Sequence, residues 1–170
     1  MRGLLVSVAL SLMTGAQAPR PDFSGTWVYV DPISGTPLPA GVIFRAPVFG
    51  REFTVKQDAD SIGIERTSSQ KQFTVTYRFD GSATASAEPG GFKQPDLKVV
   101  SRASWTDGVL SIRSVIERTV PATATKPESV RTGEALRRLR LQLNGELAIE
   151  SENPLAAGKA QLALSVYRKK

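Results

Sequence analysis

The sequence predicts an all-β protein: an antiparallel up-and-down meander of about eight or nine strands that forms a barrel or a strongly curved sheet. Apolar and polar residues alternate with a period of two along most of the chain, which is typical of strands buried on one face. Short turns containing Asp, Asn and Gly separate these runs. No segment has the apolar spacing of a long amphipathic helix. A sandwich of two sheets is the alternative architecture.

The composition limits the chemistry. The chain has 170 residues, a net charge of +6, no Cys and no His, and its length suits a single domain. Without Cys there are no disulfides, thiolate metal sites or cysteine nucleophiles. Without His there is no Ser-His-Asp triad and no imidazole ligand. We therefore expect no cofactor and no metal ion.

Residues 1–18 are predicted to be a secretory signal peptide. One positive charge precedes an apolar run, Leu4–Met13, and small residues follow it, as in export signals. The run is shorter than the roughly 20 residues that span a bilayer. Cleavage after Ala18 would leave Pro19 first, which is unfavourable, so cleavage after Ala16 is an alternative. The remaining chain, 19–170, is expected to be one β domain located in the periplasm or outside the cell, with no transmembrane segment.

The expected strands follow one another along this domain. They are Thr26–Val30, Phe53–Gln57, Ser61–Arg66, Phe73–Phe79, Lys98–Thr106, Val109–Arg118, Leu139–Leu143, a segment around Leu147 and Ile149, and Leu162–Val166. Their alternation predicts an apolar inner face made of Phe53, Val55, Ile62, Ile64, Phe73, Val75, Tyr77, Phe79, Trp105, Leu110, Ile112, Leu139, Leu141, Leu147 and Ile149. This face either fills itself or lines a pocket, since barrels of about eight strands occur in both forms.

Two hairpins have a predictable register. A two-residue turn at Asp107-Gly108 places Trp105 opposite Leu110. It also places Arg102 opposite Arg113, a like-charge pair that is unfavourable unless solvent or an anion lies between them. At Asn144-Gly145 a two-residue loop would mix the two faces, so a three-residue loop with a bulge at Gly145 is expected.

Two long segments are expected to be loops, Pro32–Gly50 and Ser82–Asp96. Loops of this length are uncommon and often functional. The first contains Phe44 and Phe49, which we expect to close the mouth of the barrel. The tip at Asp58–Asp60 is expected to be a turn rather than a calcium site, because Ca²⁺ takes six to eight oxygen ligands.

The stretch Asp22-Phe23-Ser24-Gly25-Thr26-Trp27 resembles the opening of lipocalins and fatty-acid-binding proteins. It is more similar still to functionally uncharacterised secreted bacterial proteins that begin with DFSGTW. Those proteins share an aromatic strand ending in Asp-Gly, here Tyr77–Gly81, an Ala-x-Trp-x-Asp-Gly-x-Leu hairpin, here Ala103–Leu110, and a last strand like Leu164–Lys169. The resemblance implies a lipocalin-like, calycin-type barrel.

The resemblance also assigns structural roles. It implies that Trp27 closes one end of the barrel and that Arg168 packs across the indole. Fatty-acid-binding proteins commonly hold the ligand carboxylate with Arg-x-Tyr on the last strand. Here Ser165 stands at the position of that arginine, two residues before Tyr167, so recognition of a fatty acid by that route is not expected.

The leading functional expectation is a non-catalytic protein that binds a small apolar ligand inside the barrel. The residues expected to line the site are Phe44, Phe49, Phe73, Tyr77, Phe79 and Trp105. The alternative is a protein with a filled core that binds an anionic envelope polymer through a basic outer face. That face would consist of Arg131, Arg137, Arg138, Arg140, Arg168, Lys169 and Lys170. A nucleic-acid partner is not expected, because no helix is available to read a groove.

A hydrolase or isomerase is the third possibility. It requires ionisable residues that converge inside a cleft, and the candidates are Glu65, Lys71, Arg113 and Glu117. The Ser-x-x-Lys sequence at 68–71 lies in a polar turn between two strands. It is expected to be solvated.

Overall fold

The structure is a computed structural model, and it describes residues 20–30, 40–68, 71–89, 95–153 and 161–170. The predicted signal peptide and part of the first predicted loop, residues 31–39, lie outside these ranges. The described residues form one sheet with strands β1 (Gly25–Tyr29), β2 (Val42–Arg45), β3 (Glu52–Gln57), β4 (Ser61–Ser68), β5 (Lys71–Arg78), β6 (Thr84–Glu88), β7 (Leu97–Thr106), β8 (Val109–Val120), β9 (Ser129–Leu141), β10 (Leu147–Asn153) and β11 (Gln161–Lys169). In this part of the chain no helix is long and apolar enough to cross a membrane.

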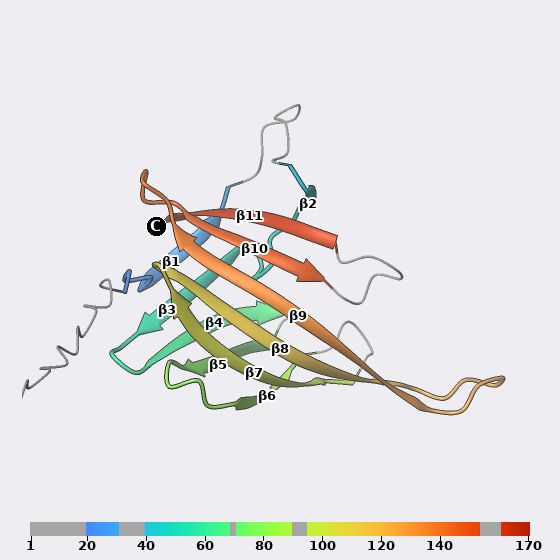
Figure 1. Cartoon of the computed structure of the whole chain (residues 1–170). Coiled ribbons are helices and arrows are strands. Elements are labelled where there is room, and N and C mark those ends of the chain that lie inside the picture. Colours follow the sequence, from blue (N-terminus) through green and yellow to red (C-terminus); the bar gives the residue numbers. More distant parts are fainter. Residues whose placement is uncertain (1–19, 31–39, 69–70, 90–94, 154–160) are drawn as a thin grey trace, which may run out of the picture.

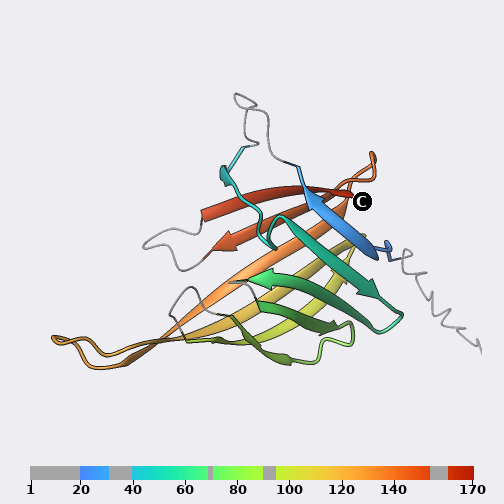
Figure 2. The same ribbon diagram turned by 180° about the vertical axis from the view of Figure 1, so that it is seen from behind.

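Ten strands form an antiparallel path in the order β5-β4-β3-β1-β11-β10-β9-β8-β7-β6. Strand β1 pairs with both β3 and β11, and so joins the first strands of the chain to its last strand. Strand β2 runs parallel to β11, outside the ten-strand path. The sheet curves around on itself, so that β5 and β6 come together (Figures 1 and 2). These two strands contact each other without forming a ladder. The predicted fold class is therefore confirmed as a nearly closed barrel, and we call the β5–β6 junction the seam.

Two strands arise from segments that were predicted to be loops. Strand β2 lies in the first of them and β6 in the second, so the strand count is slightly higher than predicted. Strand β6 shows no apolar alternation because its inward positions are Thr84, Ser86 and Glu88. A period-two search for apolar residues cannot detect such a strand.

Both predicted hairpin registers are confirmed. Trp105 pairs with Leu110 and Arg102 with Arg113 across β7 and β8. Leu141 pairs with Leu147, and the N–H of Gln142 donates to the carbonyl oxygen of Glu146, which closes a three-residue loop, 143–145. Gly145 of this loop has a φ of 80°. Such a positive φ is accessible to glycine at little cost, which explains why this residue occupies the bulge.

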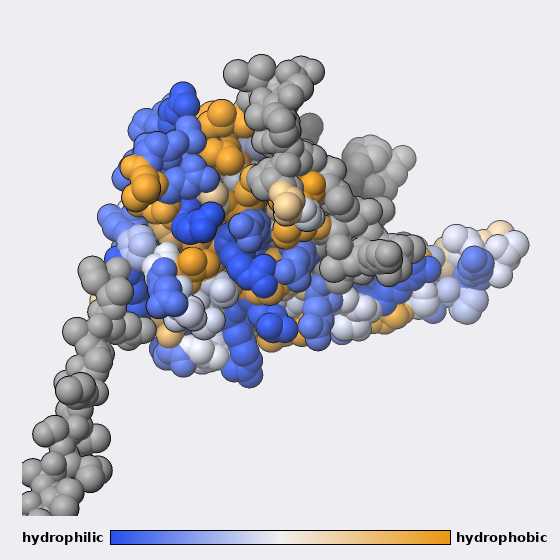
Figure 3. Space-filling model, turned by 45° about the horizontal axis from the view of Figure 1, so that its top comes forward, coloured by the Kyte–Doolittle hydropathy of each residue, from blue (hydrophilic) through white to orange (hydrophobic). Residues whose placement is uncertain are grey.

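Strands β8 and β9 continue past the barrel as a two-stranded arm (Figure 1). All residues from 121 to 132 are exposed. In Figure 3 the projecting part is mostly hydrophilic, and the barrel face seen there carries small apolar areas between hydrophilic ones. The arm adds no side chains to the main core.

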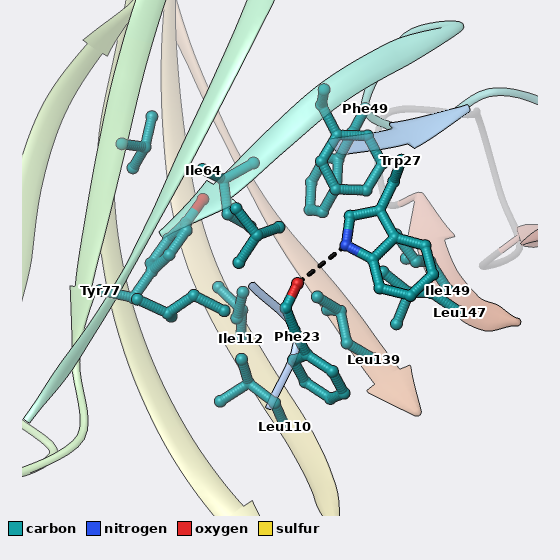
Figure 4. Packing of buried hydrophobic residues seen from close by; sticks show 14 of the residues in the cluster. Phe23, Trp27, Phe49, Ile64, Tyr77, Leu110, Ile112, Leu139, Leu147 and Ile149 are labelled. Carbon is teal, nitrogen blue, oxygen red and sulfur yellow. Dashed lines mark hydrogen bonds between the residues drawn. The ribbon is translucent and has the colours of Figure 1, made fainter. Parts of the chain in front are cut away.

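The main core lies inside the barrel. Every residue of the predicted inner face belongs to it or packs against it, and it also contains Phe23, Trp27, Phe49, Ala103 and Tyr167. The indole Nε1 of Trp27 donates a 2.8 Å hydrogen bond to the carbonyl oxygen of Phe23 (Figure 4). Gly25, two residues before Trp27, has a φ of 128°. This conformation disfavours any side chain, which explains the glycine of the Gly-x-Trp sequence.

Candidate functional site

The predicted ligand-site residues lie inside the barrel but do not form one group. Phe49 and Phe73 lie near Arg66, whereas Phe79 and Trp105 pack together with ring centroids 5.6 Å apart. Phe73 lies in β5 and Phe79 directly follows this strand. They are six residues apart, about 20 Å at the rise of a strand. Tyr77 of β5 comes between these two residues in the sequence, and its side chain is buried. The side chain of Phe44 lies outside the described residues.

The end of the barrel around Trp105 is filled by the protein's own side chains. Phe23 stacks on Trp105 with centroids 5.4 Å apart and is fully buried. Leu110, Leu139 and Leu147 are also fully buried in this cluster (Figure 4). The apolar inner face was predicted either to fill itself or to line a pocket. At this end of the barrel it fills itself.

A charged cluster lies in the interior beside the seam. Arg66 of β4 and Glu88 of β6 form an ion pair whose side chains are 10% and 11% exposed. The Arg66 guanidinium lies 4.8 Å from the ring centroid of Phe73 and 5.3 Å from that of Phe49. Arg137 of β9 approaches Phe49 as well, at 5.7 Å. We call Arg66, Glu88 and Arg137 the inner charge cluster.

The inner charge cluster has unmet hydrogen-bonding capacity. Nε and Nη1 of Arg137 and Oε1 of Glu88 are buried and have no hydrogen-bond partner. The cluster contains two guanidinium groups and one carboxylate, which leaves an excess of one positive charge. A buried charge without a partner is costly, so the cluster is suited to receiving one anionic group.

The electrostatic field of this cluster reaches Tyr77. Burial raises the pKa of the Tyr77 phenol, and Glu88 raises it further, whereas Arg137 and Arg66 oppose the shift. The phenol therefore stays protonated at neutral pH and can donate a hydrogen bond to an anion.

Additional polar groups line the barrel wall between the seam and β8. The hydroxyls of Ser82, Thr84 and Ser86 are buried without a hydrogen-bond partner, as is Nε of Arg118 on β8. Ser101 and Ser114 satisfy each other with a 2.8 Å hydrogen bond. The interior thus changes from an apolar end to a polar wall beside the inner charge cluster.

Phe49 packs its ring against the inner charge cluster. Its side chain is 1% exposed, and its backbone N–H donates to the Tyr167 hydroxyl at 3.1 Å. The same hydroxyl donates to the carbonyl oxygen of Gly50 at 3.2 Å. The N–H of Val48 donates to Oγ of Ser165 at 3.2 Å. A few hydrogen bonds to β11 therefore hold the segment in place.

The predicted pairing of Trp27 with Arg168 is wrong by one residue. Arg168 is in register with the half-exposed Val28, and its Nη2 donates to Oε1 of Glu146 at 2.9 Å. Successive side chains of a strand point to opposite faces, so Arg168 lies on the outer face while Trp27 is buried inside. Lys169 is the cation in register with Trp27.

The residues proposed for a hydrolytic site do not converge. Glu65, Lys71, Arg113 and Glu117 each have a partner on the outer surface, and their side chains are exposed or half-exposed. At the predicted turn, the Asp58 carboxylate accepts hydrogen bonds from Asp60 and Ser61, which lower its pKa. No group of three or more potential metal ligands gathers within the described ranges.

The inner charge cluster was missed from the sequence, although a signal was present. Arg66 follows Ile62 and Ile64 at the two-residue spacing of inward side chains, and Arg137 precedes Leu139 and Leu141 at the same spacing. The prediction that Arg137 belongs to the basic outer face is therefore wrong. An arginine in phase with a buried apolar row is the pattern that would have found both residues.

No protein-family model matches this chain, and a search of curated proteins finds no significant match. The nearly closed antiparallel barrel is compatible with a calycin-like fold.

Proposed function

We propose that the protein is a non-catalytic binding protein that takes a small, largely apolar molecule carrying one acid group into its barrel. The observation that carries the proposal is the half-buried Arg137, whose buried Nε and Nη1 lack hydrogen-bond partners beside a second arginine. A carboxylate satisfies two guanidinium N–H groups at once. The acid would therefore pair with Arg137, while Arg66 keeps its ion pair with Glu88.

The apolar part of the ligand would take the place of Phe49. This ring lies against both arginines, and a short segment held largely through side chains of β11 carries it. Displacing one phenylalanine side chain frees room directly beside the unpartnered nitrogens of Arg137. The filled end around Trp105 would keep its packing.

The test compares two probes of equal chain length, decanoate and decanol, by isothermal titration calorimetry. We expect decanoate to bind at least ten-fold more tightly than decanol. Arg137→Met should abolish this preference, and Arg140→Met on the outer face of the same strand should retain it. Equal affinity for both probes, or an unchanged preference in Arg137→Met, would contradict the role of the arginine.

A second variant tests the closing role of Phe49. Phe49→Leu shortens the side chain while keeping it apolar and should increase the affinity for decanoate. If neither probe binds the wild type or Phe49→Leu, binding inside the barrel is excluded and a filled-core protein remains. We place the function in the periplasm or outside the cell on the basis of the signal sequence at residues 1–18.

A further inference from the structure

A second basic site lies on the outside of the barrel, over β7, β8 and β9. The outer side chains of these strands surround a hollow of about 470 Å³ whose lining includes Arg102, Arg113 and Arg138. The hydroxyl residues Ser104 and Ser111, which face each other across β7 and β8, also line it. The volume falls in the range of small-molecule sites, about 300–1,000 Å³.

The backbone register forces two of these arginines together. Arg102 and Arg113 are directly opposite each other, which brings their Cβ atoms to about 5 Å. Like charges in this arrangement destabilise a sheet. Arg102 is restrained further, because its Nη1 donates to the carbonyl oxygen of Gly81 at 2.8 Å.

The nearby carboxylates compensate this charge only in part. In the described part of the chain Arg102 has no carboxylate partner. Arg113 reaches Glu134 at 4.0 Å with both side chains largely exposed, and such pairs contribute little. Only Arg138 has a close partner, Glu152 at 2.8 Å.

We propose that this outer hollow binds a phosphoryl group. A tetrahedral oxyanion can accept hydrogen bonds from several guanidinium groups at once. Placed between Arg102 and Arg113, it would convert their repulsion into two attractions, and the Ser104 and Ser111 hydroxyls are available as further donors. The site lies on the opposite face of the sheet from the inner charge cluster and does not depend on it.

The primary experiment measures the melting temperature in pyrophosphate and in potassium chloride of equal ionic strength. We expect pyrophosphate to raise the melting temperature of the wild type by several degrees more than chloride does. Arg102→Gln/Arg113→Gln should lose this difference while melting no lower than the wild type in chloride, because the substitution removes a like-charge pair.

Two control variants separate this site from general charge effects and from the barrel interior. Arg78→Gln removes an exposed arginine on β5, and Arg137→Met alters the inner charge cluster. Both should keep the pyrophosphate response. The proposal is overturned if chloride has the same effect as pyrophosphate, if the double variant responds like the wild type, or if Arg137→Met alone loses the response.

The source of the phosphoryl group is determined with two further probes. Glycerol 3-phosphate represents a soluble ester, and phosphatidylcholine vesicles containing phosphatidic acid represent a lipid headgroup. Binding of either that is lost in the double variant supports the proposal and identifies the source. Failure of both to bind overturns it.

Discussion

Arg66 and Arg137 point into the same barrel interior, but only one of them has a carboxylate partner. Arg66 pairs with the buried Glu88, whereas two nitrogens of Arg137 have no partner. Removing one member of a buried pair leaves the other charge uncompensated. An unpaired, partly buried charge is itself costly, so replacing it by an apolar group of similar size removes that cost. The two arginines should therefore respond to substitution in opposite directions.

We predict that Arg66→Met lowers the free energy of unfolding by about 3–5 kcal/mol. Arg137→Met should leave this free energy unchanged or increase it. Urea denaturation measures both, and Arg66→Met/Glu88→Leu serves as the control that should recover most of the loss. Equal destabilisation by Arg66→Met and Arg137→Met would mean that Arg137 also has a partner that stabilises the fold.

Tyr167 gives the fold a specific sensitivity to alkaline pH. Burial raises its pKa to about 12, from an ordinary value near 10. Its contribution to stability is complete below the unfolded pKa, because the phenol is then neutral in both states. Above about pH 10 the unfolded state loses the proton first, so the free energy of unfolding should fall between pH 10 and 12.

Tyr167→Phe removes this titration and should flatten the stability profile in that range. It should also lower the stability at pH 7 by about 1 kcal/mol for each lost hydrogen bond. Urea denaturation at pH 8, 10 and 11 provides the measurement, with the half-buried Tyr29→Phe as the matched control. An unchanged slope in Tyr167→Phe would assign the alkaline sensitivity to another group, such as Tyr77.

At the scale of elements, replacement by alanine should affect stability differently at a loop glycine, Gly145, and at a strand glycine, Gly63. Gly145 has a φ of 80° in the β9–β10 loop, where a side chain is strained. Gly63 lies within β4 at an ordinary φ, and an added Cβ would meet its neighbours at 3.7 Å or more. We predict that Gly145→Ala destabilises by about 1 kcal/mol, whereas Gly63→Ala is neutral or slightly stabilising. Thermal unfolding of both variants provides the test, and a larger loss in Gly63→Ala would contradict it.

Apolar alternation and turn chemistry together carry enough information to predict most of the meander. The Asp107-Gly108 turn fixes its register because a one-residue slip would expose Leu110 and Ile112. Strand β6 escaped prediction because its inward residues are polar, so it shows no apolar alternation. Arg66 and Arg137 were in phase with buried apolar rows, but the pairing of Arg66 with Glu88 could not be predicted, because it depends on how far the sheet curves.

At the scale of the whole molecule, the seam is the least connected part of the barrel. Each of the other junctions along the ten-strand path has a backbone ladder, whereas β5 and β6 are linked by side chains. Nearby ion pairs are Arg66 with Glu88 and, at the surface, Lys71 with Asp96 at 3.9 Å. Such side-chain links open more easily than a ladder, so local opening of the barrel should begin here.

We predict that amide hydrogens of β6 and of the β5 edge exchange faster than those where β8 pairs with both β7 and β9. Hydrogen exchange followed by mass spectrometry measures this difference. Because the inner charge cluster lies beside the seam, decanoate should slow exchange in β6 and around Phe49 while leaving the distant β8–β9 arm unchanged. Uniform slowing across all strands would instead indicate global stabilisation. If decanoate binds but the seam is not protected, the ligand lies elsewhere than against Arg137, since an acid held there would restrict the strands on both sides of the seam.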